Sequence, residues 1–157
     1  MRATLLFLAL LFPIEAFGQQ INNPLYYSEG TWTPTFIGSS TPGTGQSYAV
    51  QVGNYERVGR QVTIRFAISA TSLGTAAGNL NIGNLPFANG STVSGFCVVP
   101  FYIVTGLSAL TYGVTGYINV GGSAVNLVSG STSGSTSITV TQSGNTPTLQ
   151  GFCNYSL

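Results

Sequence analysis

The chain has 157 residues, of which four are Lys or Arg, three are Asp or Glu and none is His, and 43% of its residues are hydrophobic. Its length fits a single domain, and its apolar content excludes a disordered chain. A net charge of +1 creates no field that would attract nucleic acid or an anionic membrane, so we exclude nucleic acid as a partner.

The N-terminus has the pattern of a secretory signal. Arg2 precedes an apolar run from Ala3 to Phe12, and Ala16 and Gly18 supply the small residues of a cleavage site. The run is shorter than the roughly 20 residues of a membrane-spanning helix. We predict that residues 1–18 are a cleaved signal peptide, that no membrane insertion remains after its removal, and that the protein is exported or displayed on a virion surface. An uncleaved anchor, or a hydrophobic N-terminus docked on a partner, is the alternative.

Residues 19–29 are predicted to be a linker and residues 30–157 a head domain, in which apolar and polar residues alternate with period two. This alternation marks strands with one buried face. The clearest strand has Val62, Ile64, Phe66, Ile68 and Ala70 on its buried face, and a second has Val114, Gly116, Ile118 and Val120. Shorter strands are predicted at Tyr48–Val52, Ile138–Val140 and Leu149–Tyr155.

Phe96–Val104 is almost continuously apolar, which predicts a strand that is buried on both faces or lies at a subunit interface. Loops rich in Gly, Ser, Thr and Pro are predicted at Gly38–Ser47, Ser72–Gly78, Ser129–Ser137 and Ser143–Pro147. Many short strands at this spacing indicate an all-β fold, and we predict an antiparallel jelly-roll-like β-sandwich.

Three phrases occur in fixed order: Gly30–Pro34 (GTWTP), Gly53–Val62 (GNYERVGRQV) and Leu80–Phe87 (LNIGNLPF). In this order the chain resembles the receptor-binding head domains of bacteriophage tail fibres, over roughly residues 29–87. The resemblance implies a homotrimer that attaches to a ligand on a host surface. Tail fibres carry no export signal, so the domain has either been adopted for secretion or sits on a virion that assembles at a membrane.

The residue types present exclude most catalytic sites. Without His, Asp or Lys the chain has no Ser-His-Asp triad, no His-based metal site and no Schiff-base lysine. Glu29 and Glu56 could form a glycosidase pair only with their carboxyls about 5–9.5 Å apart. The alternative is a surface ion pair, since Arg57 adjoins Glu56, and a strand-edge charge. We predict that the protein is not an enzyme and has no metal or cofactor.

Two cysteines, Cys97 and Cys153, each end a Gly-Phe-Cys triplet. An even number of cysteines in an exported chain predicts a disulfide, whereas two separate buried thiols are the alternative. Asn89 and Asn154 each begin a glycosylation sequon, which matters only in a eukaryotic secretory route.

Aromatic residues are the candidates for ligand binding. Trp32 is either a platform for sugar stacking or a core residue at the first strand. Tyr102, Tyr112 and Tyr117 are candidates for an aromatic contact surface, with packing as the alternative. We expect Tyr112 and Tyr117 to lie near the Ser129–Ser137 loop and to contact a neutral glycan.

These observations favour a non-enzymatic, viral receptor-binding head of the spike or tail-fibre type, which attaches to a host surface glycan or protein. Two alternatives remain open at this stage. One is a secreted bacterial lectin-like or matrix protein, and the other is a purely structural capsid decoration subunit.

Overall fold

The computed structural model describes residues 26–90, 92–98, 106–107 and 113–157, and within these ranges every regular element is a β-strand. The all-β prediction is therefore confirmed for the described chain. The first strand begins at Tyr27, inside the range predicted as a linker. The ten strands are β1 (Tyr27–Trp32), β2 (Thr35–Gly38), β3 (Ser47–Val58), β4 (Gln61–Ser72), β5 (Leu80–Gly83), β6 (Gly95–Val98), β7 (Val114–Ile118), β8 (Val125–Ser131), β9 (Gly134–Ser137) and β10 (Thr148–Ser156).

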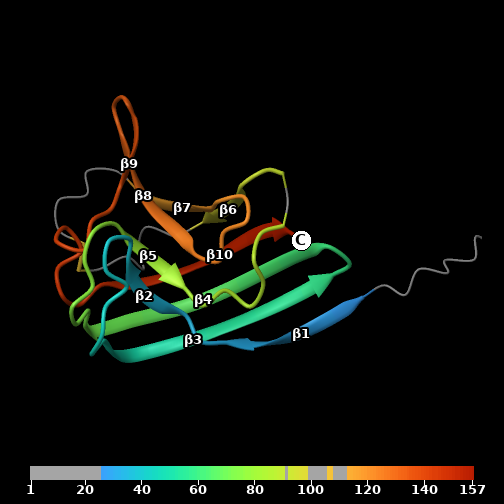
Figure 1. The fold of residues 1–157 in the computed structure, drawn as a ribbon, viewed down its shortest axis with the longest axis horizontal. Coiled ribbons are helices and arrows are strands. Elements are labelled where there is room, and N and C mark those ends of the chain that lie inside the picture. Colours follow the sequence, from blue (N-terminus) through green and yellow to red (C-terminus); the bar gives the residue numbers. More distant parts are fainter. Residues whose placement is uncertain (1–25, 91, 99–105, 108–112) are drawn as a thin grey trace, which may run out of the picture.

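All ten strands belong to one antiparallel sheet in the order β1-β3-β4-β10-β6-β7-β8-β5-β2, with β9 added to β8. The sheet curls into a half-barrel, so that β1, β3 and β4 form one side and β6, β7 and β8 face them across the core (Figure 1). The predicted jelly-roll sandwich has two sheets, whereas hydrogen bonds here run continuously through β10, which joins the two sides.

The β3–β4 hairpin forms the longest part of the sheet. Val58 pairs with Gln61 across a two-residue turn, and Gly59 at its first position has φ +59°. Glycine is favoured at this position because the turn needs a positive φ there. The twist of such a turn matches the twist of the flanking strands. The predicted strand at Tyr48–Val52 is correct but short, since pairing with β4 continues to Val58.

The core fills the inside of the curl. The predicted inward face of β4 is confirmed, because Val62, Ile64, Phe66, Ile68 and Ala70 are all buried. They belong to one core cluster with Leu149 of the neighbouring strand β10. The cluster also contains large side chains from the opposite side of the sheet, which include Phe36, Leu80, Ile82, Ile118, Val125 and Leu127. On β7 the prediction holds to Ile118, where the strand ends. Val120 lies in the following turn and is exposed, contrary to expectation.

The three sequence phrases meet across β1 and β3. Gly30 lies opposite Tyr55, and Trp32 lies opposite Gly53, so each large ring faces a residue with no side chain. A Cβ on Gly30 would lie 2.8 Å from the Tyr55 ring, and one on Gly53 would lie 2.4 Å from the Trp32 indole. Phe87, from the third phrase, packs edge-on against Tyr55 at 5.3 Å. The packing contacts among these three phrases therefore fix the register of β1 on β3.

A disulfide joins β6 to β10, as the cysteine count predicted. Cys97 and Cys153 are register partners with an S–S distance of 2.02 Å, and both side chains are buried. Phe96 beside them is 77% exposed, so the expectation of a strand buried on both faces is wrong for the described part of Phe96–Val104. Residues 99–104 lie outside the described ranges.

Two further predictions about local structure are wrong. Ser129–Ser137 is not a loop: it forms the end of β8, a tight turn and β9, with Ser129 paired to Thr136. Ile138–Val140 is not a strand, because only Thr139 makes a bridge, to Asn79. Ile138 is nevertheless buried in the core, which explains its apolar character.

Candidate functional site

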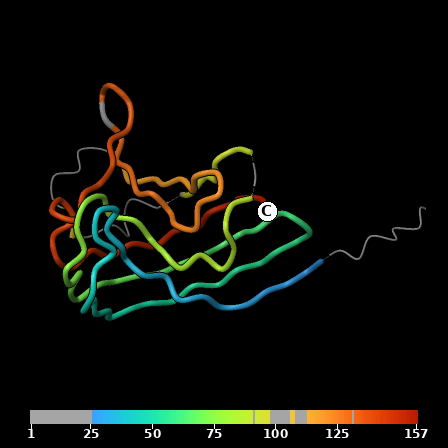
Figure 2. Tube along the Cα trace, in the orientation of Figure 1, coloured from blue at the N-terminus to red at the C-terminus, as the bar shows by residue number. Residues whose placement is uncertain are grey.

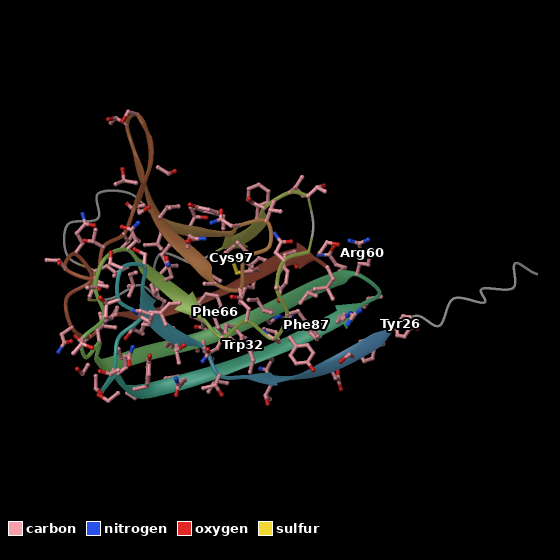
Figure 3. All side chains as sticks on the ribbon, in the orientation of Figure 1. Tyr26, Trp32, Arg60, Phe66, Phe87 and Cys97 are labelled. Atoms are coloured by element: carbon pink, nitrogen blue, oxygen red, sulfur yellow. A yellow bond between two sulfur atoms is a disulfide. The ribbon has the colours of Figure 1, made fainter. Side chains whose placement is uncertain are left out.

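Trp32 is a core residue and not a binding platform. Its side chain is only 7% exposed and meets Phe66 edge-on at 6.4 Å. Figure 3 shows both residues inside the curl of the sheet. A ring enclosed in this way presents no face on which a sugar could stack. This corrects the sugar-stacking hypothesis and supports the core alternative.

Tyr117 is the one predicted ligand-contact tyrosine that lies in the described chain, since Tyr102 and Tyr112 fall outside it. Tyr117 is partly exposed on the outward face of β7, directly opposite Phe96 of β6. Phe152 of β10 lies outward on the next strand, diagonal to Phe96, and is 40% exposed. We call Phe96, Tyr117 and Phe152 the aromatic patch. Sequence reasoning missed the two phenylalanines, because only strand register brings them together.

A second feature lies on the outward face of β1, β3 and β4. Glu29 of β1 is the register partner of Glu56 of β3, although they are far apart in sequence. With Arg65 of β4 they line an open groove of about 380 Å³. Its remaining lining residues are Gly30, Thr31, Asn54 and Tyr55. We call this the Glu–Arg groove.

Tyr27 holds one carboxylate of the groove in place. Its hydroxyl donates a hydrogen bond of 2.5 Å to Glu29 Oε2, and this bond raises the pKa of Tyr27 above its usual value. The ring of Tyr27 is exposed and, as residue i−2 on the same strand, shares the outward face with Glu29. An aromatic ring therefore stands at the rim of the groove.

The other two arginines of the described residues donate hydrogen bonds to backbone groups elsewhere. Arg57 Nε donates to Gly59 O at 2.8 Å, and its guanidinium lies 5.4 Å from the centre of the Phe87 ring. Arg60 Nε donates to the carbonyl of Leu157, at the turn beside the C-terminal end (Figure 3). The predicted partnership of Glu56 with its neighbour Arg57 is therefore not the arrangement seen, and Arg65 is the cation of the groove.

The β8–β9 hairpin is a third exposed feature. It projects from the body of the domain as a finger (Figure 2), and its residues are Ser, Thr and Gly without charge. Tyr117 pairs with Asn126 on β8, two residues before β8 begins to pair with β9 at Val128. The finger and Tyr117 thus belong to neighbouring parts of one side of the sheet.

Among the described residues no three His, Cys, Asp or Glu side chains gather to hold a metal ion. The same part of the chain contains no helix long and apolar enough to cross a membrane.

Comparison with known proteins shows a likeness in fold. No known protein family matches the sequence, and no curated protein matches it either. Among solved structures, the Dettilon tailspike protein gp208 is similar, with a TM-score of 0.57 and 18% sequence identity over 81% of this chain. The match covers 23% of the tailspike chain, so this chain corresponds to less than a quarter of that protein. The curled all-β domain is thus similar in fold to part of a tailspike.

Proposed function

We propose that the protein is a host-attachment module of a phage tail or spike structure, which binds a surface saccharide and does not cleave it. The observation that carries this proposal is the fold likeness to part of a tailspike protein. The order of the three sequence phrases, with their resemblance to tail-fibre heads, supports it independently. In this proposal the curled sheet serves as the sandwich-like head, and residues 1–18 direct it to a membrane for export or virion assembly.

The exposed position of the two carboxylates favours binding over catalysis. Glu29 and Glu56 both lie exposed on an open sheet face. Glycoside hydrolysis needs one of its two carboxyls to stay protonated near neutral pH, and a buried, apolar environment supplies that. Glu29 and Glu56 lack such an environment, and their exposed side chains are placed to accept hydrogen bonds from a ligand. Incubation with bacterial polysaccharides should therefore release no new reducing ends.

The test of attachment uses fluorescently labelled full-length protein and a panel of bacterial cells. We expect saturable binding to some strains, lost after mild periodate oxidation of surface glycans and retained after protease treatment of the cells. Loss of binding after protease treatment alone would identify a protein receptor instead. The absence of saturable binding to any strain would contradict the attachment function.

We also propose that three copies assemble through the aromatic patch. Its rings present apolar surface in a chain with few charges to keep it soluble, and a symmetric interface would cover it. Light scattering should give a trimer, which Phe96→Ser with Phe152→Ser should dissociate. Val120→Ser, at another exposed apolar position, in the turn after β7, is the control. A stable monomer at micromolar concentration would contradict the trimer.

A Tyr117 variant distinguishes ligand contact from subunit contact at the aromatic patch. If Tyr117→Ala leaves the trimer intact but weakens attachment by about tenfold or more, Tyr117 contacts ligand, because an aromatic anchor typically contributes about 2 kcal/mol. If the trimer dissociates, Tyr117 is a subunit contact.

A further inference from the structure

The charges of the domain gather in one place. After the predicted signal segment the sequence contains five charged residues, which are Glu29, Glu56, Arg57, Arg60 and Arg65. All five lie on β1, β3, β4 or the turn between β3 and β4. From Phe66 to Leu157 the chain has no charged side chain. In a domain kept soluble by neutral polar groups, a groove that holds both acids and one arginine is a chemically distinct site.

The two acids are placed against their own electrostatic preference. Glu29 and Glu56 are direct partners across antiparallel strands, an arrangement in which like charges destabilise the sheet. Arg57 and Arg60 are directed to backbone carbonyls, and Arg65 is the arginine that lines the groove with the two acids. A bound group that donates hydrogen bonds to both carboxylates would offset this repulsion.

The groove offers a matched set of hydrogen-bonding groups. The carboxylates of Glu29 and Glu56 accept only, the guanidinium of Arg65 donates only, and the side chains of Thr31 and Asn54 do both. Each hydroxyl of a vicinal diol can donate to a carboxylate and accept from a guanidinium. Tyr27, held by its bond to Glu29, adds an apolar ring face at the rim. A volume of about 380 Å³ is within the usual range for small-ligand sites.

We infer that the Glu–Arg groove binds a neutral saccharide through vicinal hydroxyl groups. This inference rests on the proposed attachment function and places its ligand on β1, β3 and β4, away from the aromatic patch. Two carboxylates against one arginine give the groove a net negative charge, which disfavours saccharides that carry carboxylate, sulfate or phosphate. An acidic ligand is therefore disfavoured, and the binding of an uncharged one depends little on salt.

The experiment uses the labelled full-length protein on an array that displays neutral, N-acetylated, sialylated and uronic-acid glycans. The wild type should bind neutral glycans and not acidic ones. Glu29→Gln, Glu56→Gln and Arg65→Gln should each weaken binding roughly tenfold or more, because each removes a hydrogen bond to a charged group. Arg60→Gln, which removes a charge at the turn outside the groove, is the matched control and should bind as the wild type does.

Stability measurements keep these variants interpretable. Glu29→Gln and Glu56→Gln remove the like-charged pair from an exposed face, so each should melt at or slightly above the wild-type temperature while losing affinity. A merely structural role would lower both properties together.

Three outcomes would overturn the inference. They are unchanged affinity in all three groove variants, a preference for acidic glycans, and binding that weakens steeply between low and high salt. If the first occurs while the wild type still attaches to cells, the attachment function stands and the groove is not its site. If the wild type binds neither cells nor glycans, both proposals fail.

Discussion

Removal of the Cys97–Cys153 disulfide should strongly destabilise the domain. The bridge joins residues separated by 56 positions, and in the chain-entropy account a loop of this length stabilises the fold by about 4 kcal/mol. For a domain of roughly 130 residues, whose unfolding entropy is about 2.1 cal/mol/K per residue, this lowers Tm by about 15 °C. The bridge also holds β6 on β10, where three residue pairs of the described chain form the ladder.

The perturbation is the double variant Cys97→Ala with Cys153→Ala, measured beside reduced wild type. Both side chains are buried, so alanine adds a small cavity cost that reduction of the wild type does not. Guanidinium chloride unfolding can be followed by fluorescence, because Trp32 is the only tryptophan and lies in the core. The slope of the free energy with denaturant should also rise without the cross-link, since the unfolded chain then exposes more surface.

The reasoning would be refuted if reduced and oxidised wild type unfolded at the same denaturant concentration. A loss seen only in the double variant would assign the effect to the cavity and not to the cross-link. A loss in both, with the variant slightly less stable than the reduced wild type, is the expected result.

Three further predictions concern the packing of the domain. Gly53→Ala should cost about 1–3 kcal/mol in denaturant unfolding, because its Cβ would overlap the Trp32 indole; an unchanged midpoint would show that the indole moves freely. Burial raises the pKa of Tyr155 to about 12, although its hydrogen bond to Phe87 O acts in the opposite direction. In the unfolded chain the pKa of a tyrosine is about 10. The free energy of unfolding should therefore be flat below about pH 10 and fall by about 1–2 kcal/mol towards about pH 12, allowing for solvent screening. Tyr155→Phe should reduce this fall, while Tyr27 and Tyr48, whose pKa values are also raised, remain. Asn89 is fully buried and donates to three backbone carbonyls, so Asn89→Ala should cost about 1–3 kcal/mol, and no glycan should be found on Asn89 in folded protein expressed in eukaryotic cells.

Strands whose apolar residues alternate strictly were predictable from the sequence. Val62 to Ala70 gives β4 nearly at its true length, because one face of that strand is buried along most of its course. The Ser129–Ser137 hairpin was not predictable by the same rule, since both of its faces are polar and its side chains carry no periodic signal. What marks it is Gly134, the first residue of β9 after the turn, where φ is +138°.

The candidate sites were harder to predict, because both depend on which strands are neighbours. Glu29 meets Glu56 only because β1 pairs with β3 and not with β2, which follows it in sequence. The aromatic patch likewise depends on β10 inserting between β4 and β6. The alternative that Trp32 is a core residue was correct. Gly53, which lies opposite Trp32 on β3, leaves room for the indole on the inner face of the sheet.

The gathering of charge on one side of the sheet has a consequence for proteolytic mapping. Trypsin cleaves after Lys or Arg, and the last such residue is Arg65 in β4. The remaining Phe66–Leu157 segment is a single tryptic peptide that contains both cysteines, so the disulfide has to be mapped with chymotrypsin. In the folded protein, cleavage at Arg57 and Arg65, which lie within paired strands, requires opening of the β3–β4 hairpin. Tryptic digestion rates therefore report the local unfolding of that one hairpin, without competing signals from the rest of the sheet.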